Sequence, residues 1–162
     1  IKYIINRLAV ISGPWQYGKQ EQGFVSLWVW RHLNNLKLNY IGFGGKGEQI
    51  RDVMHINDLC DLVNLQIKKF NKINNIVLNL GGGPKNAISL KKLTKICQDT
   101  TNRRVVIKGI RKTSIYDIPY YVTNLKKVKN TYNWQPKIRI KQIVNDIYKW
   151  MILYRKNIIN YF

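Results

Sequence analysis

The 162 residues have the mass of about one domain, and 45% of them are hydrophobic, which excludes a wholly disordered chain. Twenty-eight Lys and Arg residues against eight Asp and Glu residues give a net charge of +20, which first suggests a nucleic acid or an anionic membrane surface as partner. An alternative is compositional, because 23 Ile, 20 Lys and 18 Asn residues share A/T-rich codons that a biased genome would favour without selection for binding.

The order of the predicted elements indicates an α/β fold. Apolar runs bounded by Gly, Pro or Asn predict strands, and apolar residues three and four positions apart predict helices. In chain order, these are a strand over 3–11, a helix over 22–36, a strand over 38–43, a short strand at Arg51, a helix that opens at Asn57-Asp58 and runs to Phe70, a strand over 75–80, a helix capped by Ser89, a strand over 104–107, a lysine-rich helix capped by Thr123 or Asn124, and a helix over 140–151. Such alternation favours α/β over a helical bundle or a β-sandwich.

Cysteine and histidine usage predicts neither a disulfide framework nor a metal site. Cys60 and Cys97 lie in apolar-periodic segments, so we expect two reduced core thiols in a cytoplasmic protein, with a disulfide bridge as the alternative. His32 and His55 have no carboxylates at helical spacing, and we expect packed or surface histidines. No apolar run reaches the ~18–20 residues of a membrane span. Ile1 stands inside an apolar run without signal-peptide features, so we expect a piece of a longer protein.

Two glycine-containing segments have the local chemistry of phosphate binding. Residues 81–85 (GGGPK) follow a predicted strand and could cradle a phosphate, but they lack Walker spacing, so a plain turn is favoured. The loop ending at Gly47 leads to Arg51, which either pairs with Asp52 or binds a diphosphate through its guanidinium fork. Asp58 is expected to cap the following helix, a contribution of ~0.5–2 kcal/mol.

Several motifs resemble one enzyme family. Residues 51–59 (RDVMHINDL) resemble the R-D-hydrophobic-hydrophobic-H-V-x-D-L signature of the extended short-chain dehydrogenase/reductases, the nucleotide-sugar epimerases and dehydratases. Further resemblances are residues 6–14 to the sixth Rossmann strand and its G-P loop, 79–83 to the end of the next parallel strand, 117–121 (DIPYY) to the D-x-P-x-Y substrate segment, and 134–136 to the near-terminal W-x-P. Within the family, residues 13–19, 22–23, 40–45 and 49–52 are most similar to CDP-paratose (CDP-tyvelose) 2-epimerases.

This resemblance implies the C-terminal half of such an enzyme. The glycine-rich NAD loop and the catalytic Tyr-x-x-x-Lys pair lie upstream in the family, so the chain alone is not expected to catalyse. Residues 1–18 and 50–84 are expected to belong to the NAD-binding Rossmann domain, and 19–49 and 85–162 to a small α/β substrate-binding lobe. The resemblance further implies NAD as cofactor, a nucleotide sugar as substrate, with a CDP-sugar favoured, and a homodimer of the full-length enzyme.

The resemblance also implies roles for individual residues. Arg51 is expected to clamp the diphosphate, and Asp117 and Tyr121 to face the sugar nucleotide. The remaining candidates are Gln22, Gly23 and Phe24, which open a helix placed against the substrate, Tyr40 and Ile41, which lie where the base is held, and Pro14, which approaches the nicotinamide carboxamide. For Phe24, Tyr40 and Ile41 a core position stays an alternative.

Two departures from the family pattern concern the substrate side. Ser114 stands where an Arg is common, and Arg111 could substitute for it if the loop bulges. Asn124 stands where an Asp is common, but it can still cap a helix.

The implied reaction is inversion of a sugar carbon, the 2-position in this subfamily, through transient oxidation to a keto sugar. A 4-epimerase or a 4,6-dehydratase of the same family is the nearest rival. A non-catalytic partner subunit and a basic nucleic-acid-binding module also stay open. The nucleic-acid-binding module is disfavoured because lysine is spread over nearly every segment, so we expect neither a nucleic acid nor a membrane as partner.

Overall fold

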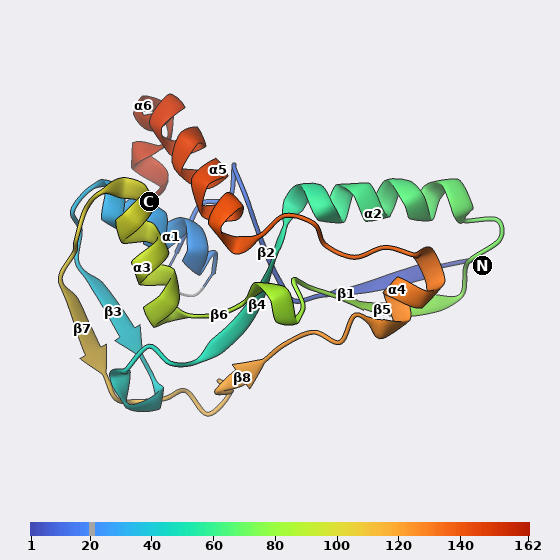
Figure 1. The fold of residues 1–162 in the computed structure, drawn as a ribbon, viewed down its shortest axis with the longest axis horizontal. Helices are drawn as coiled ribbons and strands as arrows, with labels where there is room; N and C mark the ends of the chain where they lie inside the picture. The colour runs from blue at the N-terminus through green and yellow to red at the C-terminus, as the bar shows by residue number, and fades with distance from the viewer. Residues whose placement is uncertain (20–21) are drawn as a thin grey trace.

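The computed structural model describes residues 1–19 and 22–162 and shows two lobes joined by a narrower middle (Figure 1). The elements in chain order are β1 (Ile4–Leu8), β2 (Val10–Ser12), α1 (Phe24–Leu33), β3 (Leu38–Ile41), the 3-10 turn η1 (Phe43–Gly45), β4 (Ile50–His55), α2 (Ile56–Lys69), β5 (Ile76–Leu80), the 3-10 turn η2 (Pro84–Asn86), β6 (Ala87–Ser89), α3 (Leu90–Thr101), β7 (Ile107–Ile110), β8 (Tyr120–Tyr121), α4 (Lys126–Tyr132), α5 (Ile140–Leu153), α6 (Arg155–Ile158) and the 3-10 turn η3 (Ile159–Tyr161). The predicted α/β class is confirmed. None of the described helices combines the length and apolarity needed to cross a bilayer.

Parallel pairing dominates the three small sheets. β1 pairs with β5, β2 with β4, and β3 with β7, all in parallel. The single strand predicted over 3–11 is two strands. Ala9 still donates its N–H to the Leu80 carbonyl of β5 at 2.8 Å, and from Val10 onward the chain pairs with β4 instead. β4 additionally pairs with β6 in antiparallel and with β8 in parallel orientation. The chain crosses between the two lobes several times, at β1 to β2, β4 to α2, β5 to β6 and α4 to α5.

Each lobe has its own hydrophobic core. The larger core packs α1, α3 and α5 together, with buried Trp28, Val29, Leu93, Ile147 and Trp150 among its members. The smaller core joins α2 and α4 to β5 through Leu62, Leu78, Leu80, Val128 and Tyr132. In Figure 1 these elements form the two ends of the molecule, and β2 and β4 lie between them.

Helix positions agree with the sequence patterns to within a few residues. Ser89 caps α3, as predicted, by accepting a hydrogen bond from the Lys92 N–H at 3.2 Å. Of the two cap candidates for α4, Asn124 accepts from the Lys126 N–H at 2.9 Å, while the Thr123 hydroxyl is buried without a partner.

Two expectations are corrected, and two short strands were not expected. The strand predicted over 104–107 lies at Ile107–Ile110, because its register with β3 begins at Leu38↔Ile107. The sequence does not predict β6 and β8, since two or three residues are too few to show a periodicity.

Cys60, which was expected in the core, is an exposed free cysteine, because the buried face of α2 is formed by Asp58, Leu62 and Gln66. Cys97 is also free but buried, and burial raises the pKa of its thiol far above the usual range.

The glycine run at 81–83 forms a structural turn. The Gly83 N–H donates to the buried Asp52 carboxylate at 2.7 Å, so this donor is not directed at a ligand. A Cβ atom at Gly82 would overlap the backbone carbonyl of Val53. Both contacts hold the turn against β4.

Gly82→Ala is expected to lower the free energy of unfolding by about 2–3 kcal/mol, because the new methyl group meets backbone that cannot move aside. Gly44→Ala is the matched control, since no atom lies within 4 Å of its Cβ position and only the positive φ of 77° opposes it, at about 1–2 kcal/mol. Urea unfolding of both variants measures the difference. A smaller loss at Gly82 than at Gly44 would contradict the close packing of this turn.

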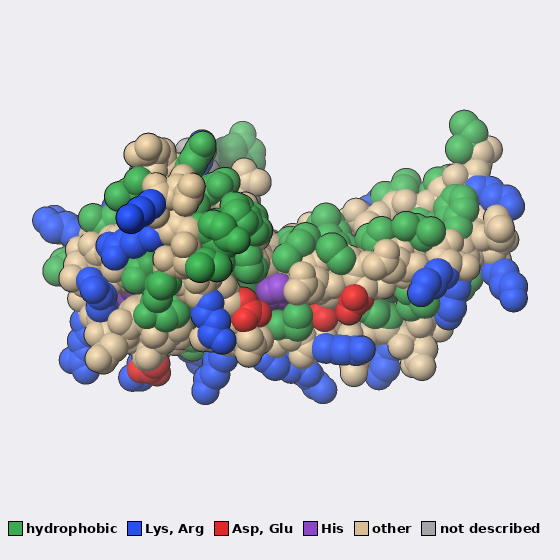
Figure 2. Space-filling model, turned by 90° about the horizontal axis from the view of Figure 1, so that it is seen from above, with side chains coloured by type: hydrophobic (Ala, Val, Ile, Leu, Met, Phe, Trp, Pro, Cys, Tyr) green, Lys and Arg blue, Asp and Glu red, His purple; other side chains and the backbone are tan. Residues whose placement is uncertain are grey.

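β1 has an open edge. Among the described residues it pairs only with β5, and Ile5 and Leu8 are about half exposed, at 48% and 50%. An apolar groove of about 430 Å³ lies next to it, lined by Ile4, Val63, Gln66, Ile67, Phe70 and Asn71. Viewed from the α2 side, hydrophobic side chains are visible along this lobe (Figure 2).

Candidate functional site

The predicted D-x-P-x-Y segment lies directly beside Arg51. β8 pairs with β4 in the register Arg51↔Tyr121, and the Ile50 N–H donates to the Pro119 carbonyl at 2.9 Å. Arg51 from one predicted motif and Asp117 and Tyr121 from another are thereby brought together. Their substrate contacts remain a prediction, but their proximity is a property of the fold.

The Arg51 guanidinium is held in place by acceptors. Nη2 lies 2.5 Å from Asp117 Oδ1 and donates to the Ile118 carbonyl at 2.6 Å, and Nη1 donates to the Ile50 carbonyl at 2.7 Å. The alternative pairing with Asp52 is wrong, because successive side chains of a strand point to opposite faces and Asp52 faces the buried Gly83 turn. The Arg51 side chain remains 21% exposed, so an incoming anion could reach it.

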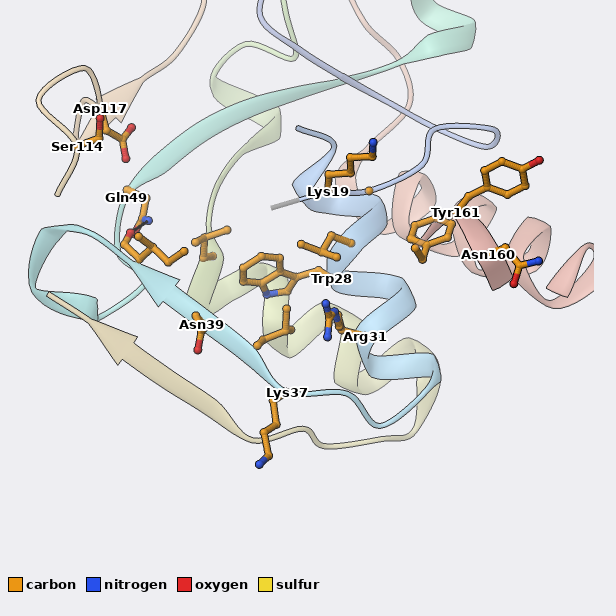
Figure 3. Close-up of a pocket in the computed structure, with 16 residues that line it drawn as sticks. Lys19, Trp28, Arg31, Lys37, Asn39, Gln49, Ser114, Asp117, Asn160 and Tyr161 are labelled. Carbon is orange, nitrogen blue, oxygen red and sulfur yellow. Dashed lines mark hydrogen bonds between the residues drawn. The ribbon is translucent and has the colours of Figure 1, made fainter. Parts of the chain in front are cut away.

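A cavity of about 810 Å³ lies next to this cluster (Figure 3). Asp117, Ser114, Gln49 and Ile41 form one side, and Lys19, Trp28 and Arg31 come from the loop before α1 and from α1 itself. The remaining lining residues are Gly18, Leu27, Lys37, Leu38, Asn39, Leu90, Asn160, Tyr161 and Phe162. Its volume suits a nucleotide-sized ligand, and its lining combines apolar walls with a few polar groups and cations.

The wall behind this cavity is a saturated hydrogen-bond network. Thr94 Oγ1 accepts from Trp28 Nε1 at 3.0 Å, lies 2.8 Å from the Tyr40 hydroxyl, and donates to the Leu90 carbonyl at 2.9 Å. The Trp28 and Tyr40 rings are nearly parallel, with centroids 6.5 Å apart. The Tyr40 side chain therefore belongs to this wall, whereas Ile41 lines the cavity.

Arg51, Tyr121 and Tyr40 do not line the cavity themselves, and four further residues predicted on the substrate side also lie outside its lining. Gln22 is exposed, and its carbonyl accepts from the Lys19 N–H at 2.7 Å. Gly23 precedes α1 with a φ of 74°, and Phe24, the first residue of α1, packs against the larger core. Arg111 is exposed beyond β7, so Ser114 rather than Arg111 contributes to the wall.

Pro14 lines a second cavity, of about 450 Å³, at the carboxyl ends of the parallel strands β2 and β4. The other lining residues are Trp15, His55, Ile56, Asn57, Asp146 and Lys149. His55 is buried, and its Nδ1 accepts from the Asn57 N–H at 3.0 Å, which caps α2 and leaves the ring proton on Nε2. Nε2 has no hydrogen-bond partner and lies 3.6 Å from Asp146 Oδ2.

Asp58 does not cap α2, contrary to expectation. Its two carboxylate oxygens accept from the backbone N–H groups of Lys137 and Ile138, at 3.1 and 3.0 Å. Asp58 is 2% exposed, so it ties the start of α2 to the segment that leads from α4 into α5.

Both histidines should make the protein less stable in acid. Burial lowers the pKa of His32, and it lowers the pKa of His55 despite the opposing effect of Asp146 and Asp58. Because the unfolded chain then binds protons that the folded chain does not, stability is complete above the unfolded pKa of about 6.5 and is lost as pH falls below it. We expect the free energy of unfolding to fall between pH 7 and pH 5, by at most about 1.4 kcal/mol per pH unit for each histidine.

Urea unfolding at pH 7, 6 and 5 measures this slope. His55→Asn keeps a cap acceptor and removes one titrating group, so its slope should be shallower. An unchanged slope in this variant would exclude His55 as a source of the acid sensitivity.

Sequence reasoning did not single out Gln49, which lines the first cavity, or Thr94, which lies in the wall behind it. Gln49 lies two residues before Arg51, in a segment where the sequence singles out only Arg51 as a site residue. Thr94 stabilises the wall from α3, and no local motif marks a threonine whose partners lie 54 and 66 residues away.

Comparison with known proteins gives a consistent family. The model of the NAD dependent epimerase/dehydratase family matches residues 1–81. The CDP-paratose 2-epimerase of Salmonella typhi is 29% identical over 153 residues, which cover 91% of this chain and 44% of the relative. A putative UDP-glucose 4-epimerase of Methanocaldococcus jannaschii is 27% identical over 157 residues, 93% of this chain and 46% of the relative.

Solved structures show the same relationship. The UDP-glucose 4-epimerase of Thermotoga maritima with UDP-glucose superposes with a TM-score of 0.75 at 25% identity, over 98% of this chain and 47% of that one. The structure of MoeE5 with UDP-glucose and NAD shares the fold, with a TM-score of 0.78 at 18% identity, over 94% of this chain and 48% of that one. The chain thus spans less than half the length of the curated relatives it matches.

Proposed function

The chain belongs to the NAD-dependent epimerase/dehydratase family, and on that premise we propose that it is the substrate-binding half of a nucleotide-sugar epimerase whose substrate is a CDP-sugar. The observation that carries this proposal is the Arg51–Asp117–Tyr121 cluster, of which Asp117 lines a cavity of about 810 Å³. A guanidinium fork matches the geometry of diphosphate oxygens. The similarity to a CDP-paratose 2-epimerase supports the choice of base and of the 2-position of the sugar.

In the proposed division of roles, Asp117 and Ile41 act from the cavity wall, and Arg51 and Tyr121 act from beside it. Arg51 binds the diphosphate after exchanging its Asp117 contact for the ligand, and Asp117 and Tyr121 meet the sugar portion. Ile41 lies along the base. Contacts to these non-reacting parts of the substrate orient the reacting carbon, which converts binding energy into positioning.

The second cavity is suited to the nicotinamide end of NAD. Pro14 and Trp15 supply an apolar wall, and the buried His55 Nε2–H is a donor without a partner. Dinucleotides bind outside the carboxyl ends of parallel strands in open α/β sheets, which is where this cavity lies. When bound, NAD supplies the hydride acceptor and donor for transient oxidation of the sugar. Pro14 and the His55 ring would hold and orient it.

We further propose that residues 1–18 and 50–84 are the part of an NAD-binding domain that this chain supplies. Residues 19–49 and 85–162 are proposed to form the substrate lobe, and residues 20–21 of this lobe lie outside the described residues. α4 packs on β5, so it covers the cofactor part although it belongs to the second segment. The open edge of β1 is where the upstream strands would pair. The complete enzyme is proposed to be a cytoplasmic homodimer, with its catalytic Tyr-x-x-x-Lys pair upstream.

Titration of the purified chain with CDP-glucose, UDP-glucose and duplex DNA tests the proposal. Saturable binding of a nucleotide sugar that free CDP displaces is the expected result. Affinity for DNA alone, falling steeply with salt, would replace the proposal with a nucleic-acid-binding module. With NAD and CDP-glucose the chain should remain inactive until the upstream half is supplied.

A UDP-sugar 4-epimerase is the second candidate. The similarity to a putative UDP-glucose 4-epimerase and to the Thermotoga maritima enzyme favours it. Tighter binding of UDP-glucose than of CDP-glucose in the same titration would select it.

A further inference from the structure

Gln49 has one end of its side-chain amide fixed by the backbone. It lies on the cavity wall near Ser114 and Asp117 (Figure 3). Nε2 donates to the Ile41 carbonyl at 2.9 Å, and this bond identifies which end of the amide carries the nitrogen. Oε1 is therefore the end that has yet to find a donor.

The Gln49 oxygen is buried without a hydrogen-bond partner. Buried acceptors are nearly always paired, so an unpaired one calls for an explanation. Among the described residues that line this cavity, Gln49 alone has a buried polar side-chain atom in this condition. An N–H group of a ligand in the cavity would satisfy it.

Two acceptors lie on the same side of the cavity as Gln49. The Ile41 carbonyl is its own partner, and the Asp117 carboxylate lies on the same side of the cavity. Gln49 directly precedes β4 and stands two residues before Arg51, a spacing that brings side chains to the same side of an extended chain. A ligand whose diphosphate reaches Arg51 can therefore present its base to Gln49.

We propose that Gln49 selects cytosine over uracil, by accepting a hydrogen bond from the exocyclic amine of cytosine. Uracil carries a carbonyl oxygen at that position, which would face the Gln49 oxygen with no hydrogen between them. This inference rests on the proposed function and adds to it the residue that determines the base.

Calorimetric titration with CDP and with UDP tests this role. Wild-type chain should bind CDP about tenfold more tightly than UDP. Gln49→Met keeps the side-chain length but has no amide oxygen, so CDP affinity should fall about tenfold while UDP affinity stays unchanged. Gln49→Glu retains an acceptor and should retain the preference for CDP. Gln142→Met, on α5 outside the cavity, is the matched control and should resemble wild type.

The ratio of the two affinities decides the outcome, because a general disturbance of the cavity wall would weaken the binding of both nucleotides alike. An equal ratio in wild type and Gln49→Met, or a wild-type chain without preference for CDP, would overturn the role of Gln49 while leaving nucleotide binding intact. Binding of neither nucleotide would overturn the proposed function itself.

Discussion

Replacing Arg51 with alanine is expected to weaken binding of a nucleotide sugar by about 10- to 100-fold. Hydrogen bonds to a charged partner contribute about 1.5–3 kcal/mol, and each 1.4 kcal/mol is a factor of ten in affinity. Arg51→Lys keeps the charge but loses the planar fork, so an intermediate loss is expected. Titration with CDP-glucose measures both.

The control is Arg103→Ala. Arg103 is exposed in the segment between α3 and β7 and belongs neither to the Arg51–Asp117–Tyr121 cluster nor to the cavity lining, so its replacement changes the net charge equally without touching the site. Equal losses at Arg51 and Arg103 would mean that only general electrostatic attraction is removed. Unchanged affinity in Arg51→Ala would exclude this residue from the diphosphate site.

Asp58→Ala is expected to cause the largest loss of stability, about 2–5 kcal/mol. The substitution removes the acceptor of two part-buried hydrogen bonds, from the N–H groups of Lys137 and Ile138, and each loss costs about 1–3 kcal/mol. Because these groups join α4 to α5, the contact between the two lobes should loosen as well. Urea unfolding gives the free energy, and hydrogen exchange at Lys137 and Ile138 reports the local opening.

Asp61→Ala removes the same charge from an exposed position of α2 and should change stability by less than about 0.5 kcal/mol. Asp58→Asn keeps one oxygen for one of the two donors, so its loss should be intermediate. A similar, small effect of all three substitutions would show that the carboxylate contacts are not what holds the segment after Trp134.

The sequence predicts the elements whose signals are local. The period of α2 and the serine before α3 are properties of neighbouring residues, and both agree with the structure to within two residues. Arg51, Asp117 and Tyr121, which two separate motifs single out, lie together because β8 pairs with β4, and their contacts with a substrate stay a prediction.

What could not be predicted depends on residues distant in the sequence. The α2 cap is expected at Asp58, but the imidazole of His55 takes that place, because the Asp58 carboxylate finds two stronger partners 79 and 80 residues later. The sequence also does not show that Arg51 pairs with Asp117 rather than with Asp52, because the alternation of side chains along a strand does not identify a distant partner. Gln49 could not be predicted as a site residue, because its proposed role rests on a buried, unpaired amide oxygen that only the structure shows.

The open edge of β1 and the excess of lysine have opposite effects on self-association of the isolated chain in solution. A strand edge with half-exposed Ile5 and Leu8 can pair with a second copy of the chain, which is the usual first step of aggregation. A net charge of +20 repels that second copy at low ionic strength. At about 1 M salt the repulsion acts over only about 3 Å. The isolated chain should therefore be most soluble in dilute buffer and self-associate as salt rises.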